Sequence, residues 1–241
     1  MIIAKIVAVL IIGYLLGSIP FGVLIGKRFA KVDVRNYGSG KMGATNVLRV
    51  AGKKAAILAL FCDLTKGALA VVFAWLVLRG EYQVVLGSAY WWLLKSAPVL
   101  AALAAIAGHT WPIFLKFRGG RGVATFFGGL FALCPAAALF SGQVVILGAG
   151  LTRFASLASI SGAVATYVIL VPLTVFNNFP IEYLVYALIG TITIVVTHRD
   201  NIARLLHGKE SKIGEKVETK NPPPPSDRGV KHAQDCHYWH H

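Results

Sequence analysis

Residues 123–150 read VATFFGGLFALCPAAALFSGQVVILGAG, an apolar run with Cys134 and Pro135 near its middle. A transmembrane helix needs about 20 residues to cross a hydrocarbon core about 30 Å thick, so this run is too long for one simple crossing. Proline removes a backbone donor and its ring clashes with the preceding turn, so a regular helix is not expected to continue through Pro135. The run therefore predicts either one broken crossing or two short helices, 123–134 and 136–150.

The rest of the chain is similarly apolar. Of its 241 residues, 56% are hydrophobic and 14% are charged, and the mean hydropathy is +0.66. Soluble domains are nearer half apolar and a quarter charged, so the chain is predicted to be an all-α polytopic membrane protein. The N-terminal run is too long for a signal peptide and lacks a small-residue cleavage site, so it is predicted to be the first span. This first span covers residues 4–25. Apart from the run 123–150, the other candidate spans are 55–78, 88–115, 155–176 and 181–197.

The formal net charge is +14 at pH 7, and the cations are concentrated in the loops between apolar runs. Such basic loops suit anionic lipid headgroups, so membrane lipid, and not nucleic acid, is the expected partner. Short loops rich in Lys and Arg stay on the cytoplasmic side of a membrane. The loop 26–54 holds eight Lys and Arg residues against one acid, Asp33, so it is predicted to be cytoplasmic and the N-terminus to be outside.

The same rule decides how residues 123–150 cross. A single crossing would leave Arg153 and the basic C-terminal stretch outside, whereas a reversal at Pro135 places every basic loop and the C-terminus inside. The chain is therefore predicted to have about seven transmembrane helices, two of them short, 123–134 and 136–150. Because the first of this pair reaches only about 18 Å at about 1.5 Å per residue, a re-entrant hairpin is the alternative.

Four polar stretches interrupt the apolar pattern, and this topology gathers them at the cytoplasmic face. A cleft built from separate loops is a common arrangement for a binding site. The stretches are NYGSGKMGATNVLR (36–49), GHTWPIFLKFRGGRGVAT (108–125), RFASLAS (153–159) and HRDNIARLLHGKE (198–210).

The first two stretches have the features of a phosphate site. Glycine-rich backbone at 38–40 and 119–122 presents several N–H groups to one anion, and helix N-termini add a favourable dipole. Arg49 and Arg121 supply guanidinium groups, which bind phosphate through two hydrogen bonds at once. The alternative is a pair of ordinary tight turns, since neither loop matches the G-x-x-x-x-G-K-[ST] nucleotide motif.

Other polar residues have simpler interpretations. His109 and His198 could each mark a helix end. Asp63 and Lys66 share one face of the second span, which favours a structural ion pair over a proton relay. The three cysteines have neither disulfide nor metal-site spacing, and no metal and no cofactor is expected.

The four polar stretches, in this order and at this spacing, resemble those of the bacterial PlsY family, the integral membrane acyl-phosphate:glycerol-3-phosphate acyltransferases. The resemblance covers about residues 5–210, so 1–210 is predicted to be the acyltransferase domain and the Pro-rich 211–241 a polar, disordered tail. It implies a seven-helix enzyme of the bacterial cytoplasmic (inner) membrane that moves a fatty acyl group from acyl phosphate to the sn-1 hydroxyl of glycerol 3-phosphate. The products would be lysophosphatidic acid and phosphate, in the first acylation of phospholipid biosynthesis.

The resemblance also implies a set of site residues. Arg121 stands where the family usually has lysine, which keeps the charge but changes the hydrogen-bond geometry. The expected catalytic residues are Ser39, His198 and Asn201. The expected phosphate-binding residues are Ser39, Arg49, Arg121, Ser159, His198 and Asn201, with supporting roles for Gly38, Gly40, Asn46, His109, Gly119 and Gly120.

Acyl phosphate is a mixed anhydride with an activated carbonyl, so the reaction needs mainly positioning and charge stabilisation. The chain lacks the His-x-x-x-x-Asp pair of acyl-CoA-dependent acyltransferases, because Phe114 and Ala203 stand five residues after His109 and His198. The attacking hydroxyl could lose its proton to a substrate phosphate while His198 orients the site, or His198 could be the general base. The alternative function is a transporter of a phosphorylated anion, which a helix break at Pro135 would suit, although no internal repeat is evident.

Overall fold

The structure is a computed structural model that describes residues 2–81 and 91–215, and within these residues every regular element is a helix. Two short 3-10 helices, Val34–Asn36 and Ile113–Leu115, lie in loops. The α-helices are α1 (Ile2–Ser18), α2 (Phe21–Ala30), α3 (Ala44–Leu78), α5 (Trp91–Thr110), α6 (Val123–Leu133), α7 (Pro135–Thr152), α8 (Ala155–Asn177), α9 (Ile181–Thr197) and α10 (Arg199–Leu206).

The helices have the lengths that a bilayer requires. Within the described residues, five spans are long and apolar enough to cross a membrane: α1 with α2, α3, α5 with the turn that follows it, α7 and α8. A sixth is made by α9 and α10 if these two helices, bent by 61°, are one span, and α6 is a shorter apolar helix. The prediction of an all-helical polytopic membrane protein is therefore confirmed.

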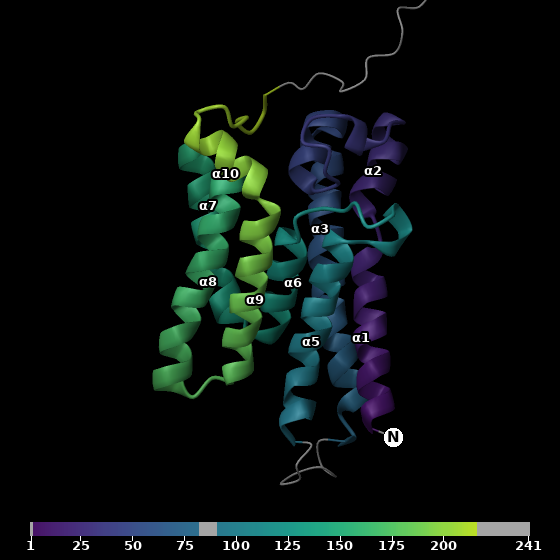
Figure 1. Cartoon of the computed structure of the whole chain (residues 1–241), viewed down its shortest axis with the longest axis vertical. Coiled ribbons are helices and arrows are strands. Elements are labelled where there is room, and N and C mark those ends of the chain that lie inside the picture. The colour runs from purple at the N-terminus through teal and green to yellow at the C-terminus, as the bar shows by residue number, and fades with distance from the viewer. Residues whose placement is uncertain (1, 82–90, 216–241) are drawn as a thin grey trace, which may run out of the picture.

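The run 123–150 is broken where the sequence predicts. α6 has 11 residues and ends at Leu133, and Pro135 begins α7, where its missing N–H costs no helical hydrogen bond. The chain reverses there, and α6 and α7 run in opposite directions (Figure 1). The two helices are unequal, however, because α7 continues to Thr152 and, at 18 residues, is a full span. Only the first helix of the predicted short pair is short.

Two other helices have breaks that the apolar pattern does not reveal. The first predicted span, 4–25, is two helices, because Pro20 has no N–H to donate and interrupts the hydrogen-bond ladder between α1 and α2. α3 begins at Ala44, well before the predicted 55, and bends at Gly52, whose φ of 83° and ψ of 179° are not helical. The segment Ala44–Ala51 therefore leads out of the span toward the loops.

The helices form two groups joined by α6. α1, α3 and α5 pack together on one side and α7, α8 and α9 on the other, with α6 between them (Figure 1). Small residues allow the close contacts: a Cβ on Gly17 of α1 would lie 2.1 Å from the Ala105 carbonyl oxygen of α5. A Cβ on Gly128 of α6 would lie 1.9 Å from the Leu64 carbonyl oxygen of α3. Such glycine contacts are typical of membrane helices, which associate through close packing.

The four polar stretches lie toward one end of the helices, and the N-terminus and the α8–α9 turn lie at the other (Figure 1). This is the gathering that the basic loops predict. The predicted outside loop 79–87 lies mostly outside the described residues, as do residues 216–241 of the predicted tail. The division into residues 1–210 and 211–241 stays a prediction.

Candidate active site

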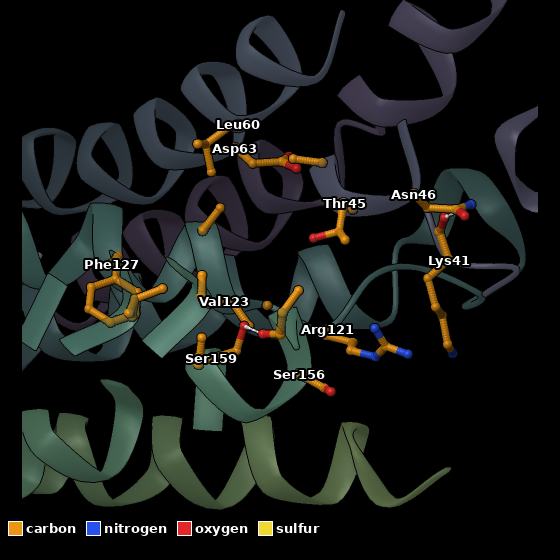
Figure 2. Close-up of a pocket in the computed structure, with 18 of the residues that line it drawn as sticks. Lys41, Thr45, Asn46, Leu60, Asp63, Arg121, Val123, Phe127, Ser156 and Ser159 are labelled. Carbon is orange, nitrogen blue, oxygen red and sulfur yellow. Dashed lines mark hydrogen bonds between the residues drawn. The ribbon is translucent and has the colours of Figure 1, made fainter. Parts of the chain in front are cut away.

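One cavity of about 1040 Å³ is lined by residues from all four polar stretches. Its polar lining comes from the loops and from helix segments that adjoin them, and most of its apolar lining comes from α3, α6 and α7. In Figure 2, Lys41, Arg121 and Ser156 lie toward one end of the cavity, and Leu60 and Phe127 lie toward the other. The predicted residues that line this cavity are Gly38, Ser39, Asn46, Arg49, His109, Arg121, Ser159, His198 and Asn201.

Three helices begin at the wall of this cavity. Ala44 opens α3, Val123 opens α6 and Ala155 opens α8, and all three residues line the cavity. The first turn of a helix has backbone N–H groups without helical partners, and the helix dipole places a partial positive charge there. The cavity is therefore suited to hold an anion.

Guanidinium groups add full positive charge. Arg49, Arg121 and Arg204 line the cavity. The pKa of Arg121 is lowered to about 10, mainly by burial; Glu210 opposes this shift, and the positive charges of Arg204 and Arg49 contribute to it. Arg121 is still protonated at neutral pH, and an anion bound among these cations would relieve their mutual repulsion.

Glu210 organises one side of the cavity, and sequence reasoning did not single it out. Its carboxylate accepts hydrogen bonds from Ser156 Oγ at 2.8 Å, Asn201 Nδ2 at 2.6 Å and Arg204 Nε at 2.7 Å. Burial raises the pKa of Glu210, but these three hydrogen bonds outweigh burial and lower it overall. Glu210 thus stays ionised and fixes Asn201 in place. The only signal in the sequence is its position within the fourth polar stretch.

His198 lies between α9 and α10, and its side chain is 2% exposed. Its Nδ1 is 2.8 Å from the carbonyl oxygen of Ile194. Because a carbonyl can only accept, Nδ1 carries the hydrogen and Nε2 is the nitrogen that can accept a proton. Burial, followed by the positive charge of Arg121, lowers the pKa of His198 to about 4. The imidazole is neutral at physiological pH.

Asn46 shapes the first polar stretch from within. Its Nδ2 donates to the carbonyls of Val34, Tyr37 and Lys41 at 2.7, 3.2 and 2.8 Å. Its Oδ1 accepts from the backbone N–H of Ser39 at 3.3 Å. Asn46 therefore closes this loop around itself and positions Ser39 at the cavity.

Three predicted glycines do not line the cavity, and the hydroxyl of Ser159, which does line it, is hydrogen-bonded within its own helix. Gly40 forms a turn, donating its N–H to the Tyr37 carbonyl at 3.0 Å with a φ of 70°. Gly119 and Gly120 pack behind the cavity wall against His109. The hydroxyl of Ser159 donates to the carbonyl of Ala155 in its own helix at 2.7 Å. Gly119 and Gly120 are therefore parts of the scaffold, contrary to the expectation that their N–H groups face a phosphate.

The apolar end of the cavity runs between α3, α6 and α7. Leucine, phenylalanine, valine, isoleucine and small residues make up most of this part of the lining, so a fatty acyl chain would find mainly apolar contacts there. The lining residues are Leu60, Phe61, Leu64, Phe127, Phe131, Ala138, Val145 and Ile146. Within residues 2–81 and 91–215, no three His, Cys, Asp or Glu side chains are grouped to hold a metal ion.

Fold and cavity together define a polytopic membrane protein whose cavity combines cationic groups at one end with an apolar lining at the other. Residues 7–208 match the family described as glycerol-3-phosphate acyltransferase, and the chain belongs to that family. The chain is 59% identical over 217 residues to glycerol-3-phosphate acyltransferase 3 of Dehalococcoides mccartyi (strain CBDB1), which covers 90% of this chain and 100% of that protein. The predicted PlsY-type acyltransferase family is confirmed, which argues against the transporter.

The structure is also similar to two crystal structures of PlsY (YgiH), an integral membrane glycerol 3-phosphate acyltransferase. The glycerol 3-phosphate form gives a TM-score of 0.75 at 36% identity, covering 87% of this chain and 96% of that one. The lysophosphatidic acid form gives a TM-score of 0.73 at 35% identity, covering 87% and 95%.

Proposed function

We propose that this protein transfers a fatty acyl group from acyl phosphate to the sn-1 hydroxyl of glycerol 3-phosphate. The products are lysophosphatidic acid and inorganic phosphate. The glycerol-3-phosphate acyltransferase activity is that of its family, and the acyl phosphate donor is the part that we add. The related PlsY structures in glycerol 3-phosphate and lysophosphatidic acid forms support the acceptor and the product.

The observation that carries the proposal is that one cavity has both a polar, cationic end and an apolar end. Its loop end has guanidinium groups, hydroxyls and helix N-termini, and its other end is apolar and lies between membrane helices. Both substrates are phosphorylated and one has a long alkyl chain. A cavity with this division of polarity accommodates the two phosphates and the chain at once.

The roles of individual residues follow from their places. Arg49 and Arg121 hold substrate phosphate, with the hydroxyls of Ser39 and Ser159 completing the shell. Asn201, fixed by Glu210, and His198 complete the catalytic end of the cavity. Because the pKa of His198 is about 4, its imidazole is a weak base and is better suited to orient the attacking hydroxyl than to remove its proton.

The reaction balances with the substrates alone. The sn-1 hydroxyl oxygen attacks the acyl carbonyl carbon, a new C–O ester bond forms, and the C–O bond to phosphate breaks. The phosphate leaves with the bonding electron pair and takes the hydroxyl proton on one of its oxygens. The cationic groups stabilise the charge that develops on the carbonyl oxygen and the leaving phosphate. His198 as the true general base is the rival for the proton step.

The site is proposed to face the cytoplasm of a bacterial inner membrane, with the N-terminus outside. The basic residues support this orientation, because the loop 26–54 and the stretch 198–212 lie at the end of the molecule that holds the cavity.

The donor is tested with the purified full-length protein and labelled glycerol 3-phosphate. We expect lysophosphatidic acid with acyl phosphate and none with acyl-CoA or acyl carrier protein as donor, with Arg49→Ala as the inactive control. Comparable turnover with acyl-CoA would overturn the proposed donor. Uptake of label into proteoliposomes without product lipid would instead support the transporter.

A further inference from the structure

Three ionisable side chains are buried together at one side of the cavity, where Asp63 and His109 form part of the wall, and the proposed chemistry uses none of them. Asp63 is 1% exposed, Lys66 2% and His109 2%. Charged groups inside a membrane protein are costly unless they are paired, and in membrane helices they usually serve a function. Their contacts indicate what that function is.

Asp63 links the other two side chains. Its Oδ1 lies 2.8 Å from Lys66 Nζ and 3.5 Å from His109 Nδ1. Lys66 Nζ also donates a hydrogen bond of 3.1 Å to the carbonyl of Ile19, at the break between α1 and α2. Lys66 therefore ties α3 to the α1–α2 break, and Asp63 brings α3 into contact with His109 at the end of α5.

His109 also contacts the glycine-rich loop 119–122. The N–H of Gly120 donates to the His109 carbonyl at 3.0 Å, and the N–H of Gly119 donates to the Thr110 carbonyl at 3.2 Å. The imidazole also lies directly against the loop, because a Cβ on Gly120 would be 2.0 Å from His109 Nε2. Arg121 is the next residue, so a shift of the Gly119–Gly120 turn would move the Arg121 guanidinium.

We propose that Asp63, Lys66 and His109 are positioning residues that fix the Gly119–Gly120 turn, so that Arg121 faces the cavity in one orientation. The proposal rests on the proposed function in taking Arg121 as a ligand of substrate phosphate. It differs from a purely structural ion pair, which would affect stability alone. It also differs from a proton relay, which would affect turnover and leave substrate binding unchanged.

Two variants test the cluster. The double variant Asp63→Leu/Lys66→Met removes both charges at similar volume and leaves neither partner unpaired, and such replacements often preserve stability. His109→Phe keeps a ring against Gly120 but loses the contact with Asp63. We expect each to raise the KM for glycerol 3-phosphate about tenfold, the size of one lost charged hydrogen bond, with a much smaller change in kcat.

Tyr186→Phe is the matched control. It removes a similarly buried hydrogen bond, from the Tyr186 hydroxyl to the Phe126 carbonyl at 2.6 Å, and neither residue lines the cavity. Its kinetics should match those of the wild type. Reduced thermal stability with wild-type KM in both cluster variants would overturn the proposal in favour of a structural ion pair. A fall in kcat at unchanged KM would overturn it in favour of a relay.

A binding measurement without donor separates this proposal from the proposed function. Glycerol 3-phosphate should raise the melting temperature of the wild type, and the cluster variants should need about tenfold more of it for the same rise. Wild-type protein that binds glycerol 3-phosphate but forms no product from acyl phosphate would count against the proposed function alone. Equal concentration dependence in wild type and both variants would count against the cluster alone.

Discussion

Arg121 is the single residue whose surroundings point most directly to an anion. Its Nε is buried and has no hydrogen-bond partner among the residues that the structure describes. With a pKa of about 10 its guanidinium remains charged at neutral pH. A buried charged donor without a partner carries a desolvation cost, which binding of a phosphate oxygen would offset.

We therefore expect Arg121→Ala to lower kcat/KM at least about tenfold, because each charge-assisted hydrogen bond contributes about 1.5–3 kcal/mol. Arg121→Lys should recover much of the activity, since it keeps the charge. Steady-state kinetics at several glycerol 3-phosphate concentrations measure the effect, with Arg118→Ala, an exposed cation of the same loop, as the control. Near-wild-type activity of Arg121→Ala, while Ser39→Ala and Arg49→Ala are inactive, would remove Arg121 from the site.

His198 predicts a pH dependence of stability. Its pKa is about 4 in the folded protein, below the ordinary value of about 6.5, so between these values the unfolded chain binds the additional proton. The contribution of His198 to the free energy of unfolding should be fully present above pH 6.5 and should be lost as the pH drops toward 4. We expect the wild type to lose roughly 2–3 kcal/mol more than His198→Gln between pH 7 and pH 4.5. Thermal melts of both proteins at the two pH values measure this, and equal losses would contradict it.

At the scale of elements, the bend in α3 decides where part of the site lies. Gly52 has a φ of 83° and a ψ of 179°, a conformation that is strained for any residue with a Cβ. The segment before the bend, Ala44–Ala51, carries Asn46 and Arg49 to the cavity. A straight α3 would direct these side chains elsewhere.

Gly52→Ala is expected to lower stability by about 1–3 kcal/mol or to straighten α3, and in either case to reduce kcat/KM. No atom lies within 4 Å of a Cβ built there, so the effect would come from the backbone and not from a clash. Gly150→Ala is the control, because Gly150 is exposed within α7 and also has open space. Alanine at 150 should stabilise by up to about 1 kcal/mol. Melting curves and kinetics that do not distinguish the two variants would refute the role of the bend.

The last described segment closes one side of the cavity. The N–H of Ile213 donates to the Arg153 carbonyl at 2.8 Å, and Arg49 Nη2 donates to the Ser211 carbonyl at 3.3 Å. Glu210, Ser211 and Ile213 all line the cavity, although the family match ends at residue 208. Residues just beyond the family match therefore help to hold Arg49 in place.

At the scale of the whole molecule, the proposed orientation predicts which positions are accessible from outside. In a cysteine-free background, Lys53→Cys and Lys209→Cys should be protected from an impermeant thiol reagent in right-side-out vesicles. Asn177→Cys, at the opposite end of the helices, should react; all three positions are exposed in the structure. Permeabilising the vesicles provides the control, since all three should then react. Labelling of position 209 in intact vesicles would contradict the orientation.

The sequence by itself determined the membrane class, the helical segments and the reversal at Pro135. These features depend on local properties: the length of apolar runs, the missing N–H of proline, and the preference of Lys and Arg for one side of a membrane. The four polar stretches and the family also follow from the order of residues alone. Most of the predicted site residues line the cavity because each lies in a stretch that cannot be buried in lipid.

Only the tertiary structure decided which side chains face the cavity and which support it. Gly119 and Gly120 look like phosphate ligands in the sequence, yet they pack against His109. Glu210, which looks like any surface acid, is fixed by Ser156, Asn201 and Arg204. The physical reason is that the direction of a side chain depends on how helices far apart in the chain pack and bend, and helix periodicity does not specify that packing.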